Sequence, residues 1–157
     1  MNQRAIILDL WICAALGAAV GCSGVDKNEN NNTPVGEGTL TGEVSSTVTC
    51  DASPESDCAG TLYLVLMADD PVSNPYQTPE AFEIIPGVDL SSGTASYTLN
   101  NVPAGQWFIS GFLDDDDNAG ALRAPDKGDP FSYPAPEVTI TPDNTTTQNV
   151  TLTGRMP

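Results

Sequence analysis

The stretch GTASYTLNNVPAGQWFISGFLD, residues 93–114, decides the fold class of this chain. Apolar and polar residues alternate on both sides of its centre, which is the period of a β-strand with one buried face. The residues expected on the buried faces are Ala95, Tyr97 and Leu99, then Trp107, Ile109 and Leu113. Phe108 and Phe112 fall on the opposite face of the second segment. The turn NNVPAG between the segments predicts two strands that form a hairpin.

The rest of the chain from Gly38 onward shows the same kind of pattern, with short apolar runs between Gly, Pro, Asp and Asn. No window has sustained helical spacing. Five further strands are expected, at residues 40–44, 61–68, 82–86, 137–141 and 149–153. The run TLYLVLMA (61–68) is nearly all apolar, which predicts a central strand covered on both faces. Seven strands at this spacing predict a single all-β, antiparallel sandwich over residues 38–157.

A signature with specific residues runs from Tyr97 through Leu99, Val102, Pro103 and Gly105 to Trp107. It resembles the "G-x-Y-x-L-x-x-V/L-P-x-G-x-Y/W-x-V/I" hairpin of carboxypeptidase-regulatory-like and transthyretin-like β-sandwich domains, and the opening TLTGEV supports the likeness. The resemblance implies an Ig/transthyretin-like sandwich in which Tyr97 and Trp107 fill the core and Pro103 and Gly105 shape the turn. Such domains are usually accessory modules, so the likeness implies a fold and no activity.

The charge and the residue composition of the chain argue against several classes of function. The chain of 157 residues has 21 acidic and 5 basic residues and no histidine, which gives a net charge of −16. Nucleic acid is not an expected partner, because neutralising phosphates needs Lys and Arg clusters. Without histidine there is no Ser-His-Asp or Cys-His arrangement and no imidazole zinc site. No enzyme is expected, although a carboxylate-dependent hydrolase stays open as an alternative.

The N-terminal segment MNQRAIILDLWICAALGAAVGCSG has Arg4, then an apolar run from Leu10 to Val20, then small residues. This is the pattern of a secretory signal peptide, and the run is too short to span a bilayer comfortably. The end of the signal, Ala19-Val20-Gly21-Cys22, resembles the lipobox of bacterial lipoproteins. We therefore expect a lipoprotein signal peptide at residues 1–21.

The same resemblance implies that Cys22 becomes the lipidated N-terminus, with acyl chains such as palmitate as a membrane anchor. Ser23 follows the cysteine, and in Gram-negative lipoproteins a residue other than Asp there usually permits transfer to the outer membrane. An ordinary cleaved signal with an incidental Cys22 is the alternative. Residues 22–37 are rich in Asn and Gly, which predicts a flexible tether between the anchor and the domain.

Two cysteines, Cys50 and Cys58, remain after the signal peptide and Cys22 are set aside. An even pair in an exported protein predicts a disulfide. The loop between them, CDASPESDC, is polar and has strand-like sequence on either side, so the bridge is expected to join two neighbouring strands at one end.

The stretch FLDDDDNAGALRAPDKGDP, residues 112–130, concentrates acidic residues directly after a core strand. Its spacing D-x-D-x-N is the beginning of a calcium loop, because alternate side chains of a turning loop point to one side. Asp126 and Asp129 follow as carboxylates that close the site. The predicted metal ligands are Asp114, Asp116, Asn118, Asp126 and Asp129, and the predicted ion is calcium.

The loop is not an EF-hand, because Ala119 replaces the expected glycine and Pro125 replaces the closing glutamate. It resembles the D-x-D-x-N-G…D-x-G-D loops between strands of exported bacterial β-sandwiches. A solvated acidic loop without a metal is the alternative, and Arg123 and Lys127 offer internal neutralisation of the carboxylates.

Together these features predict a lipid-anchored structural or binding module of the cell envelope, at the outer membrane or cell surface. A protein or glycan is its expected partner, and an adhesin or carbohydrate-binding module is the alternative. Tyr97, Trp107 and Phe108 are expected in the core and not on a sugar-stacking surface, since they lie within alternating strands. Phe131 and Tyr133 are not assigned to the core, and either a cover for the metal site or a partner-facing surface suits them.

Overall fold

The computed structural model describes residues 35–51, 57–74, 77–120 and 123–157. The predicted signal peptide (1–21), the predicted lipidation site Cys22 and most of the predicted tether (22–37) lie outside the described residues. Across the described residues there is no helix with the length and apolar character needed to cross a bilayer.

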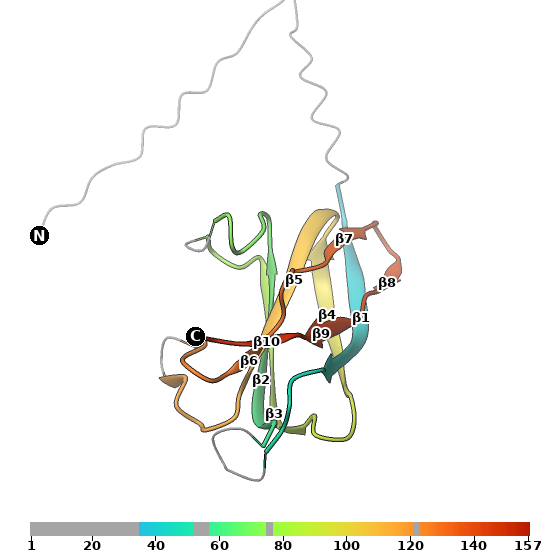
Figure 1. Ribbon diagram of the computed structural model, residues 1–157. Coiled ribbons are helices and arrows are strands. Elements are labelled where there is room, and N and C mark those ends of the chain that lie inside the picture. Colours follow the sequence, from blue (N-terminus) through green and yellow to red (C-terminus); the bar gives the residue numbers. More distant parts are fainter. Residues whose placement is uncertain (1–34, 52–56, 75–76, 121–122) are drawn as a thin grey trace, which may run out of the picture. The chain divides into compact units, whose positions relative to one another are not determined.

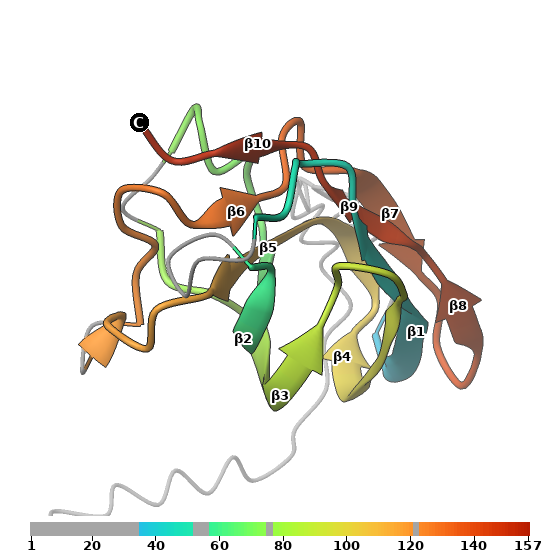
Figure 2. The same cartoon turned by 60° about the horizontal axis from the view of Figure 1, so that its bottom comes forward.

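The described part of the chain contains ten strands joined by loops and turns (Figure 1). They are β1 (Glu37–Ser46), β2 (Ala59–Met67), β3 (Ala81–Asp89), β4 (Ala95–Pro103), β5 (Gly105–Asp114), β6 (Pro130–Phe131), β7 (Glu137–Ile140), β8 (Thr145–Thr147), β9 (Val150–Leu152) and β10 (Gly154–Arg155). The first sheet has the order β4-β1-β8, and β9 also pairs with β1. The second sheet has the order β10-β6-β5-β2-β3, and β7 also pairs with β5 (Figure 2).

The two sheets enclose one apolar core, so the prediction of an all-β sandwich is confirmed. Alternate residues of each strand face the partner sheet because successive side chains point to opposite sides. Fully buried core residues come from both sheets: Leu40, Val44, Val102, Val150 and Leu152 from the first, and Leu62, Leu64, Leu66, Ile109, Leu113 and Ile140 from the second. Trp107 packs against this cluster, and Tyr97 lies within it.

Two aromatic residues of the signature stretch also make polar contacts. The Tyr97 hydroxyl donates to the Gln148 carbonyl at 2.5 Å, and burial raises the pKa of this phenol. The Trp107 ring nitrogen donates to the Pro103 carbonyl at 2.8 Å. Both side chains therefore fill the core while their polar atoms are satisfied, as buried Tyr and Trp generally require.

The strand number and the strand directions differ from the prediction. All seven expected strands are present, but β6, β8 and β10 are additional. Each has only two or three residues, which is too short for an alternating pattern to be visible in the sequence. The sandwich is also not purely antiparallel, because β8 and β9 run parallel to β1.

The predicted hairpin at residues 93–114 is wrong. β4 pairs with β1, with Tyr97 opposite Gly42, whereas β5 pairs with β2, with Leu113 opposite Leu62. The chain thus passes from one sheet to the other between Pro103 and Gly105. Pro103 has no N–H with which to extend a ladder, and its carbonyl is taken by Trp107. The predicted turn NNVPAG (100–105) was also too long, because residues 100–103 belong to β4 and Gly105 begins β5, so Ala104 alone connects the two strands.

The outer face of β2 is less covered than predicted. Leu62, Leu64 and Leu66 are fully buried, but Tyr63 and Val65 on the other face are only half-buried. The Tyr63 ring stacks on Phe112 with ring centroids 4.7 Å apart. β2 is central in its sheet, as expected, but only one of its faces is enclosed.

The predicted disulfide between Cys50 and Cys58 is confirmed, with a Cα–Cα distance of 5.4 Å. Cys50 follows β1 in the first sheet, and Cys58 immediately precedes β2 in the second. The bridge therefore links the segment after β1 to the start of β2. Two neighbouring strands were expected, but β1 and β2 do not pair and belong to different sheets.

Candidate metal centre

The acidic loop, residues 114–120, begins inside the second sheet. Asp114 is the last residue of β5, lies opposite Thr61 of β2 and is only 1% exposed. A side chain at Gly60 would bring a Cβ within 1.9 Å of the Asp114 carbonyl oxygen, so only glycine permits this close approach of the two strands. The sheet therefore fixes the position of the first carboxylate.

The Asp114 carboxylate also shapes the loop that follows it. Its two oxygens accept the backbone N–H groups of Asn118, at 3.0 Å, and of Ala119, at 3.2 Å. Asp117 has a positive φ of 60°, which lets the chain turn back at this point. A short acidic side chain that accepts nearby backbone N–H groups is a common device for stabilising a turn.

The return segment, residues 123–129, ends at Asp129, which is also 1% exposed. The backbone of Asp129 is held by the C-terminal end of the chain, because its carbonyl accepts the Met156 N–H at 3.0 Å. Its carboxylate accepts the Asp126 N–H at 2.9 Å. The pairing of β6 with β10 thus positions a carboxylate from a part of the sequence remote from Asp114.

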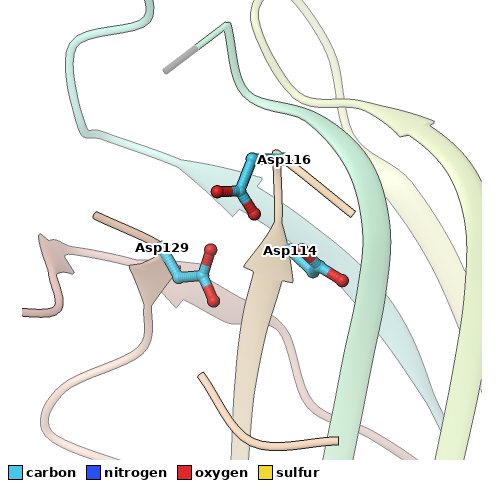
Figure 3. A group of neighbouring side chains, drawn as sticks. All are labelled: Asp114, Asp116 and Asp129. Atoms are coloured by element: carbon cyan, nitrogen blue, oxygen red, sulfur yellow. The ribbon is translucent and has the colours of Figure 1, made fainter. Parts of the chain in front are cut away.

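These two segments bring three carboxylates together, and we call Asp114, Asp116 and Asp129 the carboxylate cluster. One oxygen of each lies within 4.8 Å of the others (Figure 3). Burial, with the charges of Asp126, Asp114 and Asp115, raises the pKa of Asp129 to about 6. Partial desolvation and the charges of Asp126 and Asp114 also raise the pKa of Asp116. The folded protein thus holds these groups together against their mutual repulsion.

The carboxylate cluster can hold a metal ion. It offers oxygen ligands alone, which suits a hard divalent cation better than zinc, whose structural sites rely on nitrogen and sulfur. Each carboxylate has about four lone-pair sites, so the hydrogen bonds described above leave acceptor capacity on every member. Exposed acidic groups are also common in proteins without a metal.

The other two predicted ligands lie beside the cluster. The Asn118 side-chain amide donates to the Asp116 carboxylate at 2.6 Å, so in this arrangement its nitrogen faces Asp116. Asp126 is close enough for its charge to raise the pKa values of Asp116 and Asp129. The Oδ1 atom of Asp126 is buried and has no hydrogen-bond partner among the described residues. Such an atom carries a desolvation cost that a nearby cation would offset.

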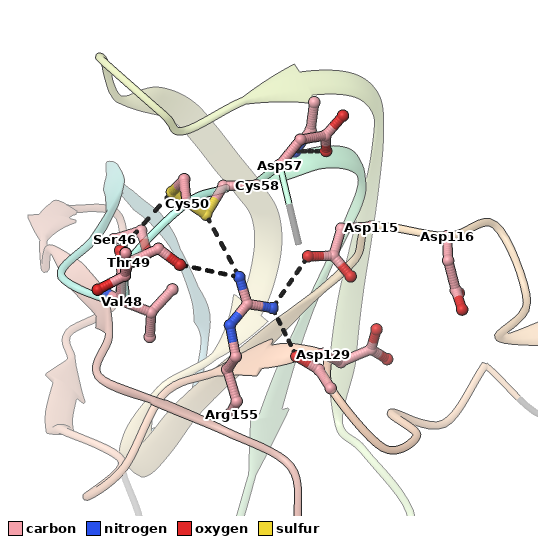
Figure 4. A network of polar contacts seen from close by, with 12 residues as sticks. Ser46, Val48, Thr49, Cys50, Asp57, Cys58, Asp115, Asp116, Asp129 and Arg155 are labelled. Atoms are coloured by element: carbon pink, nitrogen blue, oxygen red, sulfur yellow. Dashed lines mark hydrogen bonds and ion pairs between the residues drawn. A yellow bond between two sulfur atoms is a disulfide. The ribbon is translucent and has the colours of Figure 1, made fainter. Parts of the chain in front are cut away.

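Asp115 has a different role, which was not recognised from the sequence. Its side chain is 2% exposed and forms an ion pair with Arg155, with Nη1 and Oδ2 3.1 Å apart (Figure 4). Burial raises the pKa of Asp115, and the hydrogen bond and charge of Arg155 oppose that shift. The sequence did contain a signal for this role. Successive side chains of the loop point to opposite sides, so Asp115 should point away from Asp114 and Asp116.

The cations that the sequence suggested as neutralising partners are placed elsewhere. The Arg123 guanidinium lies 5.6 Å from the centre of the Phe82 ring, and both Arg123 and Lys127 are exposed. Arg155 lies two residues after the last predicted strand (149–153), where nothing in the local pattern links it to an acidic residue 40 positions earlier.

A cavity of about 310 Å³ adjoins the cluster. One wall consists of Asp114, Asp115, Asp116 and Asp117, and the remaining lining residues are Ala59, Gly60, Thr61 and Gly87. Apart from the carboxylates, Thr61 supplies the only polar side chain among the lining residues. The cavity therefore offers negative charge and little else for holding a substrate.

A second hollow, which we call the outer groove, lies on the outer face of the second sheet and has a volume of about 300 Å³. Its lining includes Val65, Val72, Phe112, Phe131, Tyr133 and Met156. Tyr133 is 51% exposed. Phe131 and Tyr133 are therefore not in the core between the sheets, and they line an apolar surface.

Comparison of the sequence with family models gives no match. Comparison with curated proteins also gives no match.

Proposed function

We propose that this chain is an exported, lipid-anchored module of the cell envelope, with an Ig/transthyretin-like sandwich whose carboxylate cluster binds a structural calcium ion. The observation that carries the proposal is the convergence of Asp114, Asp116 and Asp129 from two segments of the chain. The buried Oδ1 atom of Asp126, which has no hydrogen-bond partner in the described part of the chain, also supports it.

Calcium suits the site better than other common cations. It takes six to eight oxygen ligands in a flexible geometry, whereas magnesium demands a tighter octahedron and gives up its waters reluctantly. Asp114, Asp116 and Asp129 would be the first ligands, with the side chains of Asp126 and Asn118 beside them. The ion would join the acidic loop to the return segment and relieve the repulsion between their carboxylates.

The first experiment is a calcium titration of the full chain by calorimetry, combined with thermal melting. We expect a Kd of roughly 0.1–1 mM, as in extracellular calcium modules. At a few millimolar calcium this affinity adds roughly 1–2 kcal/mol to the free energy of unfolding. Asp116→Asn with Asp129→Asn should remove both effects, since the amides keep the shape and lose the charge.

Asp143→Asn is the matched control, because it removes a carboxylate from an exposed turn outside the cluster. If the unchanged protein shows neither heat nor stabilisation with calcium, the cluster is a solvated acidic site and the proposal fails. If the control variant loses the effect as strongly as the double variant, the binding depends on total charge and not on this site.

The export and anchoring of the chain rest on the signal-like segment at residues 1–21 and on Cys22. The Cys50–Cys58 disulfide supports export, because such bonds persist mainly in oxidising compartments. Cys22→Ala should move the protein from the membrane fraction to the soluble fraction. An unchanged membrane association in this variant would contradict lipidation at Cys22.

A non-catalytic role is part of the proposal. The cavity beside the carboxylate cluster has no described side chain other than Thr61 and the acidic residues to orient a substrate. A hydrolase built on two carboxylates generally also needs groups that bind and distort the substrate. Hydrolysis of polysaccharide substrates that Asp116→Asn abolishes would overturn this part.

The outer groove favours partner binding as a second candidate function. Contiguous apolar surface on a soluble domain often marks an interaction site. Beside Tyr133, the polar side chains of the lining are Ser110 and Ser132. Their hydroxyls lie 3.2 Å apart, within hydrogen-bonding distance, and Ser132 is buried. Few polar groups are thus left for a glycan, and an apolar side chain is the better fit.

The charged residues near the outer groove indicate which residues should flank that apolar side chain in the partner. The exposed Asp69 and the partly exposed Asp70 precede the groove residues Pro71 and Val72. We therefore propose a protein segment that combines apolar side chains with Lys or Arg. Selection from a displayed peptide library should enrich such sequences, and Tyr133→Ala should weaken their binding. Enriched peptides without basic residues, or binding to glycans instead, would contradict this candidate.

A further inference from the structure

We infer that Arg155 is a positioning residue for the cation site and that it couples the Cys50–Cys58 disulfide to cation binding. This inference rests on the proposed calcium site and assigns its control to residues outside the ligand set. The observation behind it is a single guanidinium that contacts three separate segments of the chain (Figure 4).

The contacts of Arg155 reach both sides of the carboxylate cluster. Its Nη1 donates to the Asp115 carboxylate at 3.1 Å and to the Gly128 carbonyl at 2.7 Å. Asp115 lies between Asp114 and Asp116, and Gly128 directly precedes Asp129. One nitrogen therefore contacts a residue adjacent in sequence to every member of the cluster, through a carboxylate in one segment and a backbone carbonyl in the other.

The other nitrogen of the same guanidinium reaches the disulfide. Nη2 donates to the Thr49 carbonyl at 3.1 Å and lies 3.8 Å from the Cys58 sulfur. Thr49 directly precedes Cys50, so the bridge holds this carbonyl in place. Breaking the bridge frees the segment that contains Thr49 and removes one side of the support for the guanidinium.

The backbone of Arg155 is itself held firmly. β10 pairs with β6, with Arg155 opposite Pro130 and Gly154 opposite Phe131. The side chain therefore extends from a fixed strand, and its position is transmitted to the loops that it contacts. Hydrogen-bond partners of this kind, outside the ligands, commonly tune metal affinity by orienting the ligands.

Charge adds a second effect of Arg155. The guanidinium forms an ion pair with the buried Asp115 carboxylate. Its positive charge therefore compensates the repulsion that Asp115 would otherwise add to the three carboxylates of the cluster. Arginine is needed for this arrangement, because its planar fork donates in several fixed directions. A lysine keeps the charge but has a single ammonium group, which cannot reach all three segments in this geometry.

The test is calcium binding by the full chain in detergent, for Arg155→Lys, Arg155→Met and the matched control Arg123→Met. Replacing a supporting residue of a metal site generally weakens binding, and we expect roughly a tenfold increase in Kd for both Arg155 variants. Arg123→Met removes the same charge from an exposed position over Phe82 and should leave Kd unchanged. Melting in a chelator measures stability separately from affinity.

The coupling to the disulfide is tested with Cys50→Ser and Cys58→Ser together. This change should weaken calcium binding when Arg155 is present and should have little further effect in the Arg155→Met chain. Effects of the two changes on Kd that do not add up indicate that both act through the same contact. If Arg155→Met does not fold, Asp115→Asn with Arg155→Lys provides the same comparison in chains that keep similar side-chain shapes.

The outcomes separate the two proposals. Calcium binding that is unchanged in the Arg155 variants, even with a lowered melting temperature, overturns the positioning role and leaves the calcium site in place. Equal weakening by Arg123→Met shows an effect of net charge and also overturns it. If the unchanged protein does not bind calcium, both the site and the inference fail.

Discussion

Between the two sheets, the fully buried side chains are aliphatic, such as Leu62, Leu64 and Ile109. Where β5 ends and β6 begins, the buried side chains include Asp114, Asp115 and Asp129. The first region is stabilised by removing apolar surface from water, which requires no specific partner. The second holds charges that are buried only because hydrogen bonds, an ion pair and, as we propose, a cation compensate them.

This difference indicates that the two regions respond to different conditions. Apolar burial changes little with pH, chelators or reducing agents, whereas the acidic end contains titrating groups, a disulfide and a candidate cation site. The four predictions below test whether the regions are independent, starting with the largest expected effect.

The largest expected effect is a loss of core packing. Leu64→Ala removes a fully buried side chain at the centre of β2 and should lower the free energy of unfolding by about 2–5 kcal/mol. Denaturant unfolding should give the same loss in calcium and in a chelator, because Leu64 belongs neither to the carboxylate cluster nor to the lining of the adjoining cavity. A loss that depends on calcium would show that the two regions are coupled.

The next effect is removal of the disulfide. Replacing Cys50 and Cys58 by serine should cost about 2–3 kcal/mol in the chain-entropy treatment of a short loop. Denaturant unfolding under non-reducing conditions measures this change. Reduction of the unchanged protein should give a similar loss, and a variant as stable as the oxidised protein would contradict a stabilising role for the bridge.

A smaller effect is expected for the hydroxyl of Tyr97. Tyr97→Phe leaves the Gln148 carbonyl without this donor and should cost about 1 kcal/mol. Tyr133→Phe is the control, because that side chain is largely exposed. Thermal melting of both variants compares them directly, and equal melting temperatures would show that the Tyr97 hydrogen bond contributes nothing.

The last prediction concerns the dependence of stability on pH in a chelator. The pKa of Asp129 is about 6 in the fold and 3.8 as its ordinary value, so the native state holds more protons between these values. Stability of the metal-free protein should therefore fall as pH rises through this range. The raised pKa values of Asp115 and Asp116 act in the same direction.

Melting temperatures at pH values below and above this range measure that dependence. Asp129→Asn should flatten it, and calcium should offset the loss most at the higher pH, where it competes with fewer protons. The lowered pKa of Asp89, which comes from its hydrogen bonds to Ser91, opposes the trend because it favours the fold as pH rises. A metal-free protein whose stability rises between the two pKa values of Asp129 would contradict the prediction.

Much of the fold and part of the site were predictable. The period of two in the strands identified the positions of seven of the ten described strands, and the pairing of Cys50 with Cys58 followed from the count of cysteines. The spacing of Asp114 and Asp116 indicated that both point to one side of a turn. These features depend on neighbouring residues, so a local pattern is enough to reveal them.

The sequence by itself determined that this protein is an all-β sandwich with an acidic loop after a core strand. The tertiary structure decided that β4 and β5 belong to different sheets, that β8 and β9 run parallel to β1, and that Arg155 meets Asp115. It also decided that Asp129 joins Asp114 and Asp116. The physical reason is that alternation specifies which face of a strand is buried, whereas its neighbour in the sheet depends on how distant segments pack together.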